Sequence, residues 1–127
     1  MQSDLTQPLV IIAEDDVDAR HMMTKYLKAL EVRVVEVDDG APALAAVQAE
    51  LPALIVLDVN LPSMSGFEIC EKLRRKTATA RIPVLIVTAR DSLEDHARAR
   101  EVGVNKFMTK PVRKKEFTEA VRALLGR

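Results

Sequence analysis

The sequence has no tryptophan and few aromatic side chains of any kind, which make up only 3% of its 127 residues. Nucleic-acid binding by stacking bases on aromatic side chains is therefore not expected. The single cysteine, Cys70, cannot form an internal disulfide, which fits a reducing compartment such as the cytoplasm. The longest apolar runs, such as Leu9–Ala13 and Ile82–Val87, are far too short to span a bilayer. These absences predict a cytoplasmic protein with no membrane segment and no direct nucleic-acid contacts.

The length and the charge pattern indicate one domain whose charge is unevenly distributed along the chain. A chain of 127 residues is typical of a single domain. The net charge is zero, yet residues 1–60 carry 4 basic and 11 acidic side chains, and residues 98–127 carry 9 basic and 3 acidic ones. Most of these charges are expected to lie on solvated faces. The acidic part is still a candidate for holding a cation, and the basic part for contacting an acidic partner.

Apolar runs and helical periodicities alternate along the chain. We expect five strands, at Leu9–Ala13, Arg33–Val37, Ala53–Leu57, Ile82–Val87 and Lys106–Thr109. We expect five helices, at Val17–Leu30, Ala41–Leu51, Phe67–Lys76, Ser92 to about Val102, and Lys115–Leu125. Strands this apolar belong in a parallel sheet covered on both faces, and right-handed crossovers then predict an α/β, doubly wound sandwich. Only residues 1–8 look flexible, so the domain is expected to span residues 9–127.

Polar residues crowd at the places where the predicted strands end. Glu14 and Asp15 follow the first strand, Asp58 follows the third, Thr88 ends the fourth and Lys110 follows the fifth. In an open parallel sheet, ligands bind beyond the carboxyl ends of the strands, at the point where the strand order reverses. With the order 2-1-3-4-5, this point lies between the first and third strands. The three carboxylates are therefore expected to meet there.

Three carboxylates in one place need a cation. At about 5 Å and an effective dielectric of about 20, each pair repels by roughly 3 kcal/mol. Lys110 supplies one positive charge, and a hard divalent ion held by oxygen atoms would supply the rest. The expected ion is Mg²⁺, because no histidine or cysteine stands near these positions to favour zinc. The neighbouring acids have a structural interpretation instead: Asp16 and Asp18 as caps of the first helix, and Asp38 and Asp39 as turn residues on the far side of the first strand.

In these residues the sequence resembles the receiver domains of two-component response regulators. The matching segments are Ile11–Asp16, Val56–Pro62, Met64–Gly66, Val87–Ala89 and Thr109–Pro111. They occur in the family's order and at its spacing, and the resemblance extends over nearly the whole chain. No segment is specific alone, whereas the five together are very specific. The resemblance implies a flavodoxin-like fold with the strand order 2-1-3-4-5 and a phosphoacceptor signalling module of a phosphorelay system.

The resemblance also implies roles for the residues at the strand ends. Asp58 would accept a phosphoryl group from a phosphohistidine on a sensor histidine kinase or a histidine phosphotransfer protein. Mg²⁺ would be bound by the carboxylates of Asp15 and Asp58, by the backbone carbonyl of Asn60, and by Glu14 through water. Lys110 would neutralise charge on the phosphoryl group after transfer, and a structural salt bridge to Asp58 is an equally open interpretation before it. Such a site fits a loose phosphoryl-transfer transition state, which needs positioning and charge neutralisation more than covalent help.

A further set of residues would couple phosphorylation to output. Thr88 would move to bond a phosphoryl oxygen, and the space it leaves can take the ring of Phe107, for which ordinary core packing is an equally good interpretation. Ala89 would leave room for the phosphoryl donor, Arg90 would flank the site, and the bond before Pro111 is usually cis in this family. The face formed by the fourth helix, fifth strand and fifth helix would then control a downstream protein or a fused effector.

Three other functions compete with this one. A Mg²⁺ phosphohydrolase with an aspartyl nucleophile commonly carries Asp-x-Asp, whereas this chain has Asp58-Val59-Asn60. A flavin or nucleotide binder would need a glycine-rich phosphate loop after the first strand, where acids stand instead. A pseudo-receiver that switches without phosphate is disfavoured by the complete set of acids. We therefore expect a phosphoryl acceptor and switch, not an enzyme with an external substrate. The sequence leaves open the kinase, the target, the oligomeric state, and whether the receiver stands alone or is cut from a longer regulator.

Overall fold

The computed structural model describes residues 7–127 and contains a five-stranded parallel sheet with the order β2-β1-β3-β4-β5. The strands are β1 (Leu9–Ala13), β2 (Arg33–Val37), β3 (Leu54–Leu57), β4 (Val84–Thr88) and β5 (Lys106–Thr109). The helices are α1 (Val17–Leu27), α2 (Gly40–Glu50), α3 (Gly66–Arg75), α4 (Leu93–Val102) and α5 (Lys114–Leu125). The predicted doubly wound α/β fold and its strand order are thereby confirmed. Of the segment expected to be flexible, residues 1–6 lie outside the described residues.

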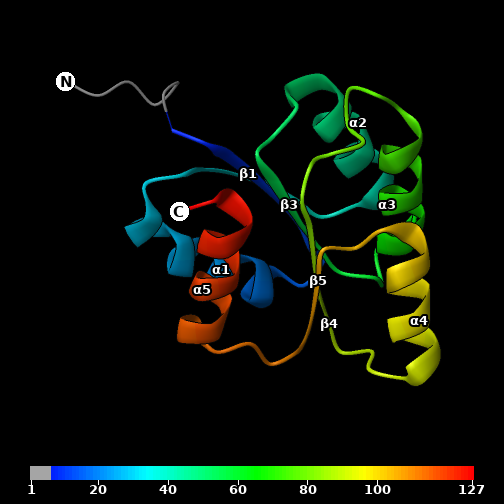
Figure 1. Cartoon of the computed structure of the whole chain (residues 1–127). Coiled ribbons are helices and arrows are strands. Elements are labelled where there is room, and N and C mark those ends of the chain that lie inside the picture. The colour runs from blue at the N-terminus through cyan, green and yellow to red at the C-terminus, as the bar shows by residue number, and fades with distance from the viewer. Residues whose placement is uncertain (1–6) are drawn as a thin grey trace.

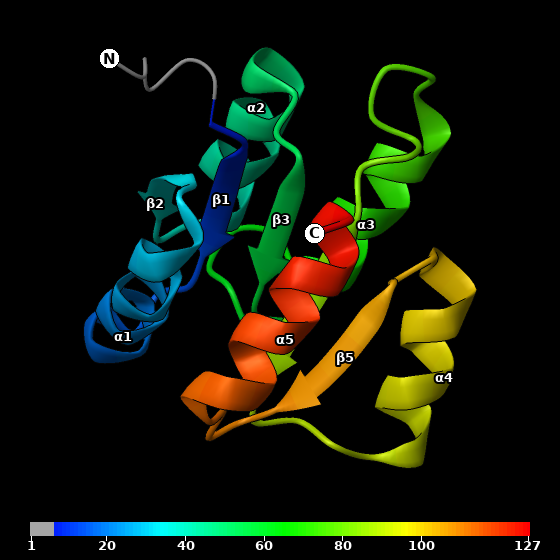
Figure 2. The same ribbon diagram turned by 60° about the vertical axis from the view of Figure 1, so that its left-hand side comes forward.

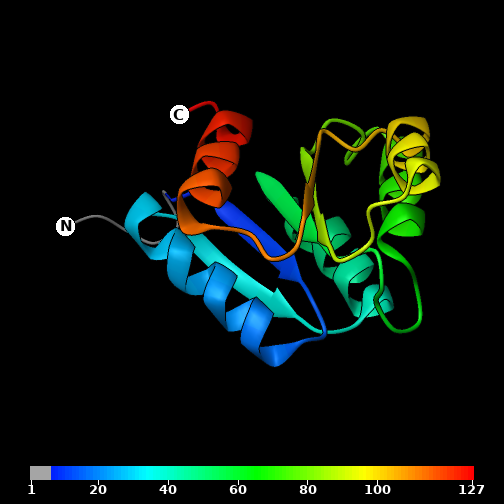
Figure 3. The same ribbon diagram turned by 90° about the horizontal axis from the view of Figure 1, so that it is seen from below.

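Helices cover both faces of the sheet. Helices α1 and α5 lie together on one face, and α2, α3 and α4 lie on the other (Figures 1 and 3). This division follows from the reversal of strand order between β1 and β3, because right-handed crossovers on either side of that point place their helices on opposite faces. The same reversal leaves a crevice at the carboxyl ends of β1 and β3.

Alternate residues of the central strands fill two separate cores. In β1, Ile11 packs toward α2 and α3, whereas Val10 and Ile12 pack toward α1 and α5. All residues of β1, β3 and β4 are buried, while the edge strands β2 and β5 are partly exposed. Burial on both faces explains why the central strands are continuous apolar runs without polar alternation. None of the helices in the described part of the chain is long and apolar enough to cross a membrane.

Two boundaries differ from the predictions by more than one residue, each for an identifiable reason. The first helix is α-helical only to Leu27 and continues as a 3₁₀ turn, Lys28–Leu30. Residues three apart eclipse in a 3₁₀ turn, so Leu30 is buried on the same side as Leu27. The fourth strand begins at Val84 and not at Ile82, since Pro83 between them has no N–H for the sheet ladder.

Two glycines allow loops to pack closely beside the carboxyl edge of the sheet. A Cβ at Gly40 would lie 2.1 Å from the carbonyl oxygen of Met64, and a Cβ at Gly66 would lie 2.4 Å from that of Asp58. Both distances are shorter than any side chain tolerates, so α2 and α3 can begin where they do only because these residues have no side chain. Gly66 therefore fixes the backbone of Asp58 against the start of α3.

The side chain of Arg74, on α3, connects three segments at the opposite end of the sheet. Its guanidinium donates to the carbonyls of Gly103 at 2.9 and 3.1 Å, of Ala80 at 3.1 Å and of Ile82 at 2.8 Å. It also donates to Oδ1 of Asn105 at 2.9 Å. Each of these acceptors would otherwise need another donor, because an unsatisfied, partly buried carbonyl is costly. Arg74 thus joins α3 to the end of α4 and to the approach to β4.

We expect Arg74→Met to lower the free energy of unfolding by about 2 to 3 kcal/mol, since hydrogen bonds from a charged donor to several carbonyls are lost together. The matched control is Arg75→Met on the same helix, because Arg75 is 69% exposed and pairs only with Glu71. That variant should lie within about 0.5 kcal/mol of wild type in urea unfolding. Equal losses of unfolding free energy in the two variants would contradict the conclusion that the hydrogen bonds of Arg74 stabilise the fold.

Candidate functional site

The carboxyl ends of the strands bring the predicted polar residues together at one edge of the sheet, toward which β1, β3 and β5 all point (Figure 2). The sheet ladder continues into these residues and fixes their backbones. The N–H of Glu14 donates to Val37 at 2.9 Å, and the N–H of Asp58 donates to Ala13 at 3.0 Å. The N–H of Lys110 donates to Thr88 at 2.8 Å. Their positions are therefore set by strand pairing, not by flexible loops.

Three carboxylates meet at this edge. Glu14, Asp15 and Asp58 each offer a carboxylate oxygen, and these oxygens lie within 4.8 Å of one another. Glu14 is fully buried and Asp58 is 6% exposed, whereas Asp15 faces solvent. The acids thus line a pocket that is buried at its base and open at Asp15. The sequence prediction that these three residues converge is confirmed.

Lys110 bridges two of the acids. Its Nζ lies 2.8 Å from Oδ2 of Asp58 and forms an ion pair with Glu14. Oδ1 of Asp58 accepts the N–H of Asn60 at 3.1 Å. Both oxygens of Asp58 are therefore held in place, which presents the carboxylate in a fixed orientation.

Burial and the neighbouring charges shift the pKa values of two groups in the cluster, Glu14 and Lys110. Burial raises the pKa of Glu14, assisted by the Asp58 carboxylate, although hydrogen bonds from Lys110 and from the N–H of Asp16 act in the opposite direction. Burial also pulls the pKa of the Lys110 ammonium down, but its hydrogen bonds and ion pairs with Asp58 and Glu14 outweigh this and raise it overall. Lys110 accordingly remains charged and neutralises part of the cluster.

The donor set fits a hard divalent cation. Three carboxylates and one ammonium leave a formal charge of −2, which one divalent ion balances. The converging atoms are oxygens, and Mg²⁺ prefers carboxylates, carbonyls and water. Glu14, Asp15 and Asp58, with the backbone carbonyl of Asn60, are the residues that could hold it.

The hydroxyl of Thr88 and the side chain of Arg90 lie at the same edge of the sheet, after β4. Thr88 is fully buried at the end of β4, and its Oγ1 accepts the N–H of Arg90 at 3.4 Å. Nη1 of Arg90 donates to Oδ1 of Asn60 at 3.4 Å. Ala89, between them, is exposed and offers only a methyl group. The peptide bond from Lys110 to Pro111 is cis, as the family resemblance implied.

The other acids near β1 and β2 lie outside the carboxylate cluster, and of the two acids predicted to cap the first helix only Asp16 does so. Asp16 caps α1, with Oδ2 accepting the N–H of Ala19 at 2.9 Å, and Asp18 lies in the first turn of that helix. Asp39 precedes α2 and accepts a hydrogen bond from the hydroxyl of Ser63. None of these side chains belongs to the metal-ligating cluster.

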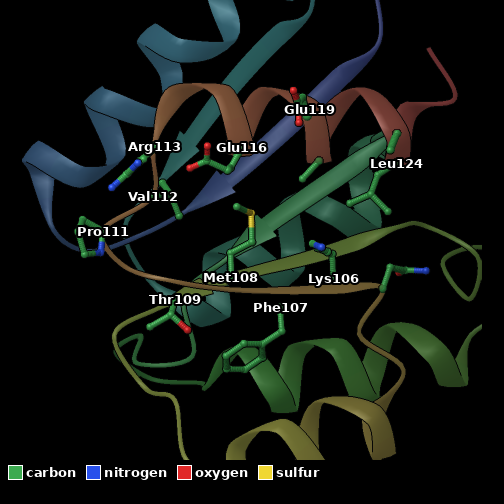
Figure 4. A pocket seen from close by; sticks show the side chains of 13 residues that line it. Lys106, Phe107, Met108, Thr109, Pro111, Val112, Arg113, Glu116, Glu119 and Leu124 are labelled. Atoms are coloured by element: carbon green, nitrogen blue, oxygen red, sulfur yellow. The ribbon is translucent and has the colours of Figure 1, made fainter.

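Phe107 packs between β5 and α4. Its ring is directed toward α4, while the side chain of Met108 points to the other side of the strand, toward α5 (Figure 4). The ring centroid lies 4.3 Å from that of His96 on α4, which pairs with Asp91 at 2.7 Å. On the α5 side of β5 there is an open groove of about 570 Å³, whose lining includes Met108 and Leu124 (Figure 4). The groove lies away from the acidic pocket and takes no part in its chemistry.

Sequence reasoning missed Asp95. This residue stands in the first turn of α4 and is 5% exposed, and Nη2 of Arg90 lies 2.6 Å from its Oδ1. The spacing Ser92-x-x-Asp95 is the pattern of a capping box, in which the two residues bond each other's backbone N–H groups. That pattern was a usable signal for the buried acid, whereas its pairing with Arg90 depends on the path of the loop between β4 and α4.

The fold and the site together define a class of protein: a doubly wound α/β domain with a cluster of acids that could hold a cation at the switch point of its sheet. Comparison with known families gives the finer assignment. Residues 10–122 match the model of the response regulator receiver domain, which covers most of the chain. The chain belongs to this family.

Individual relatives agree with the family assignment. The transcriptional regulatory protein TctD of Salmonella typhimurium is 36% identical over 118 residues, which are 93% of this chain and 52% of TctD. The response regulator PleD of Caulobacter vibrioides is 36% identical over 115 residues, 90% of this chain and 25% of PleD. Among solved structures, chemotaxis protein CheY4 of Vibrio cholerae is 26% identical with a TM-score of 0.86, covering 94% of this chain and 99% of CheY4. Since the chain spans about half of TctD and a quarter of PleD, the likeness identifies the domain and not an output activity.

Glu14→Gln is expected to stabilise the metal-free protein at neutral pH, because it removes a buried charge whose folded pKa is raised above the ordinary 4.5. The ionised form of Glu14 costs stability, so its contribution is favourable below pH 4.5 and is lost as the pH rises through the folded pKa. The advantage of the variant should accordingly shrink as urea unfolding is repeated at lower pH in EDTA. The exposed control Glu50→Gln should track wild type throughout. A Glu14→Gln variant less stable than wild type at neutral pH would contradict this expectation.

Proposed function

We propose that the protein is the phosphoacceptor module of a two-component or phosphorelay system, with Asp58 as the phosphorylated residue. The observation that carries this proposal is the setting of Asp58. Its carboxylate lies in a cluster of three acids, one oxygen is bonded to the Lys110 ammonium, and the Thr88 hydroxyl lies at the end of the adjacent strand. This arrangement supplies a fixed oxygen nucleophile together with groups that neutralise an incoming anion.

The reaction transfers a phosphoryl group from a histidine nitrogen of the donor to a carboxylate oxygen of Asp58. An oxygen of Asp58 attacks the phosphorus of a phosphohistidine, the P–O bond forms, and the P–N bond breaks with the imidazole as leaving group. Mg²⁺, when bound by Glu14, Asp15, Asp58 and the Asn60 carbonyl, supplies charge neutralisation for the phosphoryl oxygens. Lys110 is placed to exchange its ion pair with Asp58 for one with a phosphoryl oxygen. Ala89 leaves space for the donor.

Thr88 and Phe107 would convert the chemical change into a change of surface. The Thr88 hydroxyl stands at the carboxyl end of β4, and β4 lies beside β5 with Ile86 opposite Phe107 and Thr88 opposite Thr109. Movement of Thr88 would therefore alter the space beside Phe107, whose ring contacts α4. The output surface would be the face of α4, β5 and α5, which includes the open groove along β5 (Figure 4).

The partners follow from this role. The donor would be a sensor histidine kinase or a histidine phosphotransfer protein, and the receiver of the signal would be a downstream protein or a fused effector, all in the cytoplasm. The protein would catalyse its own phosphorylation and dephosphorylation only. The phosphohydrolase alternative lacks support because Asn60 stands where such enzymes place a second acid, and its side chain accepts a hydrogen bond from Arg90.

Incubation with acetyl phosphate and Mg²⁺ is expected to add the mass of one phosphoryl group to the intact protein. Asp58→Asn should abolish this gain, since the amide cannot form an acyl phosphate, and EDTA should abolish it in wild type. The control Asp38→Asn, at an exposed acid just after β2, should behave as wild type. A gain that survives Asp58→Asn, or no Mg²⁺-dependent gain at all, would overturn the proposal.

A further inference from the structure

Arg90 connects the acidic pocket to the start of α4. Its N–H donates to Oγ1 of Thr88 at 3.4 Å, and its Nη1 donates to Oδ1 of Asn60 at 3.4 Å. Its Nη2 lies 2.6 Å from Oδ1 of Asp95 in the first turn of α4. One residue thus contacts the hydroxyl expected to bind phosphate, the loop that follows Asp58, and the helix expected to carry the output.

Asp95 is an unusual partner because it is buried. Its side chain is 7% exposed, whereas that of Arg90 is 47% exposed. Oδ2 of Asp95 accepts the N–H of Ser92 at 3.2 Å and the hydroxyl of Ser92 at 2.8 Å. These hydrogen bonds from Ser92, followed by that from Arg90, lower the pKa of Asp95, so it remains an anion. The Arg90 guanidinium is the ion-pair partner of this anion, so its departure would remove one electrostatic contact from the first turn of α4 while the hydrogen bonds from Ser92 remain.

The guanidinium has space in which to move. An open hollow of about 470 Å³ between α3 and α4 is lined by Arg90 and Asp95 together with Phe67 and Arg98. Arg90 is held by one short ion pair to Asp95 and one long hydrogen bond to Asn60.

Phosphorylation changes the charge that Arg90 meets. Before transfer, three carboxylates, Lys110 and a divalent ion sum to zero. Transfer converts the Asp58 carboxylate into a neutral acyl group and adds a phosphoryl group of about −1.5 to −2. The pocket therefore becomes more negative by about one-half to one charge, and the Arg90 side chain already reaches Asn60 at its rim.

We propose that Arg90 is a phosphoryl-contacting residue whose guanidinium leaves Asp95 when Asp58 is phosphorylated, and that loss of this ion pair loosens the first turn of α4. The inference rests on the proposed function and adds to it a direct electrostatic connection between the pocket and α4. Asp95 and the phosphoryl group then compete for one cation. Removing the cation and removing its competitor must have opposite effects on the affinity for a phosphoryl mimic.

The test is the binding of beryllofluoride in the presence of Mg²⁺, followed by fluorine NMR. Arg90→Gln should weaken binding by about 1.5-fold to fivefold, the range of one partly exposed ion pair. Asp95→Asn should strengthen binding by a similar factor, because Arg90 is then free to contact the mimic. Asp95→Asn added to Arg90→Gln should give no such gain. The control Arg100→Gln removes an exposed charge elsewhere on α4 and should leave the affinity unchanged.

Amide hydrogen exchange in the first turn of α4 provides a second measurement. Beryllofluoride should accelerate exchange at Asp95 and His96, whose N–H groups donate to Ser92, in wild type and in Arg100→Gln. In Arg90→Gln the same amides should exchange fast without beryllofluoride and should not change when it is added. If Asp95→Asn does not fold, the exchange in Arg90→Gln alone decides the question.

Two results would overturn the inference. Loss of affinity in both Arg90→Gln and Asp95→Asn, or a wild-type α4 response in Arg90→Gln, would show that the pair is merely structural while leaving the role of Asp58 intact. Failure of wild type to bind beryllofluoride at Asp58 would overturn both this inference and the proposed function.

Discussion

Mutual repulsion among three carboxylates at the end of a parallel sheet is the constraint on which the rest of the site depends. Strand pairing forces Glu14, Asp15 and Asp58 to within 4.8 Å of one another, and two of them are buried. One ammonium, from Lys110, cannot neutralise three anions. The folded chain therefore has an unbalanced negative charge that favours a divalent cation. In the proposed function, that cation and Lys110 would together neutralise the charge of the phosphoryl group.

The fold holds the three acids in place despite their repulsion, because they follow two strands in the buried centre of the sheet. β1 and β3 are buried along their whole length, and Gly66 allows α3 to start against the carbonyl of Asp58. A pocket built on such strands does not relax by moving its acids apart. In the proposed mechanism, the charge change would instead reach two groups beside the acids: Thr88, and Arg90, which is hydrogen-bonded to Thr88 and paired with Asp95 at the start of α4.

Much of this arrangement could be predicted from the sequence, because it follows from local patterns. The apolar runs define the buried strands, and polar residues at four strand ends predict one site once the strand order is known. The role of Asp16 as the cap of α1 could be predicted in the same way. Long-range pairings away from the strand ends could not be predicted. Arg74 bonds carbonyls 6 to 29 residues away, and Arg90 reaches Asn60 across 30 residues. Such contacts depend on loop paths, which neither hydrophobic periodicity nor motif spacing describes.

The coupling between Mg²⁺ and stability tests the central claim most directly. Urea unfolding of wild type and Asp15→Asn, with NaCl used to hold ionic strength constant, should separate repulsion from metal binding. Wild type is expected to gain unfolding free energy with rising Mg²⁺, by about 2.7 kcal/mol at a concentration of a hundred dissociation constants. Asp15→Asn should be more stable than wild type without Mg²⁺ and should respond far less to the ion. A wild type indifferent to Mg²⁺, or a variant that responds equally, would contradict the account.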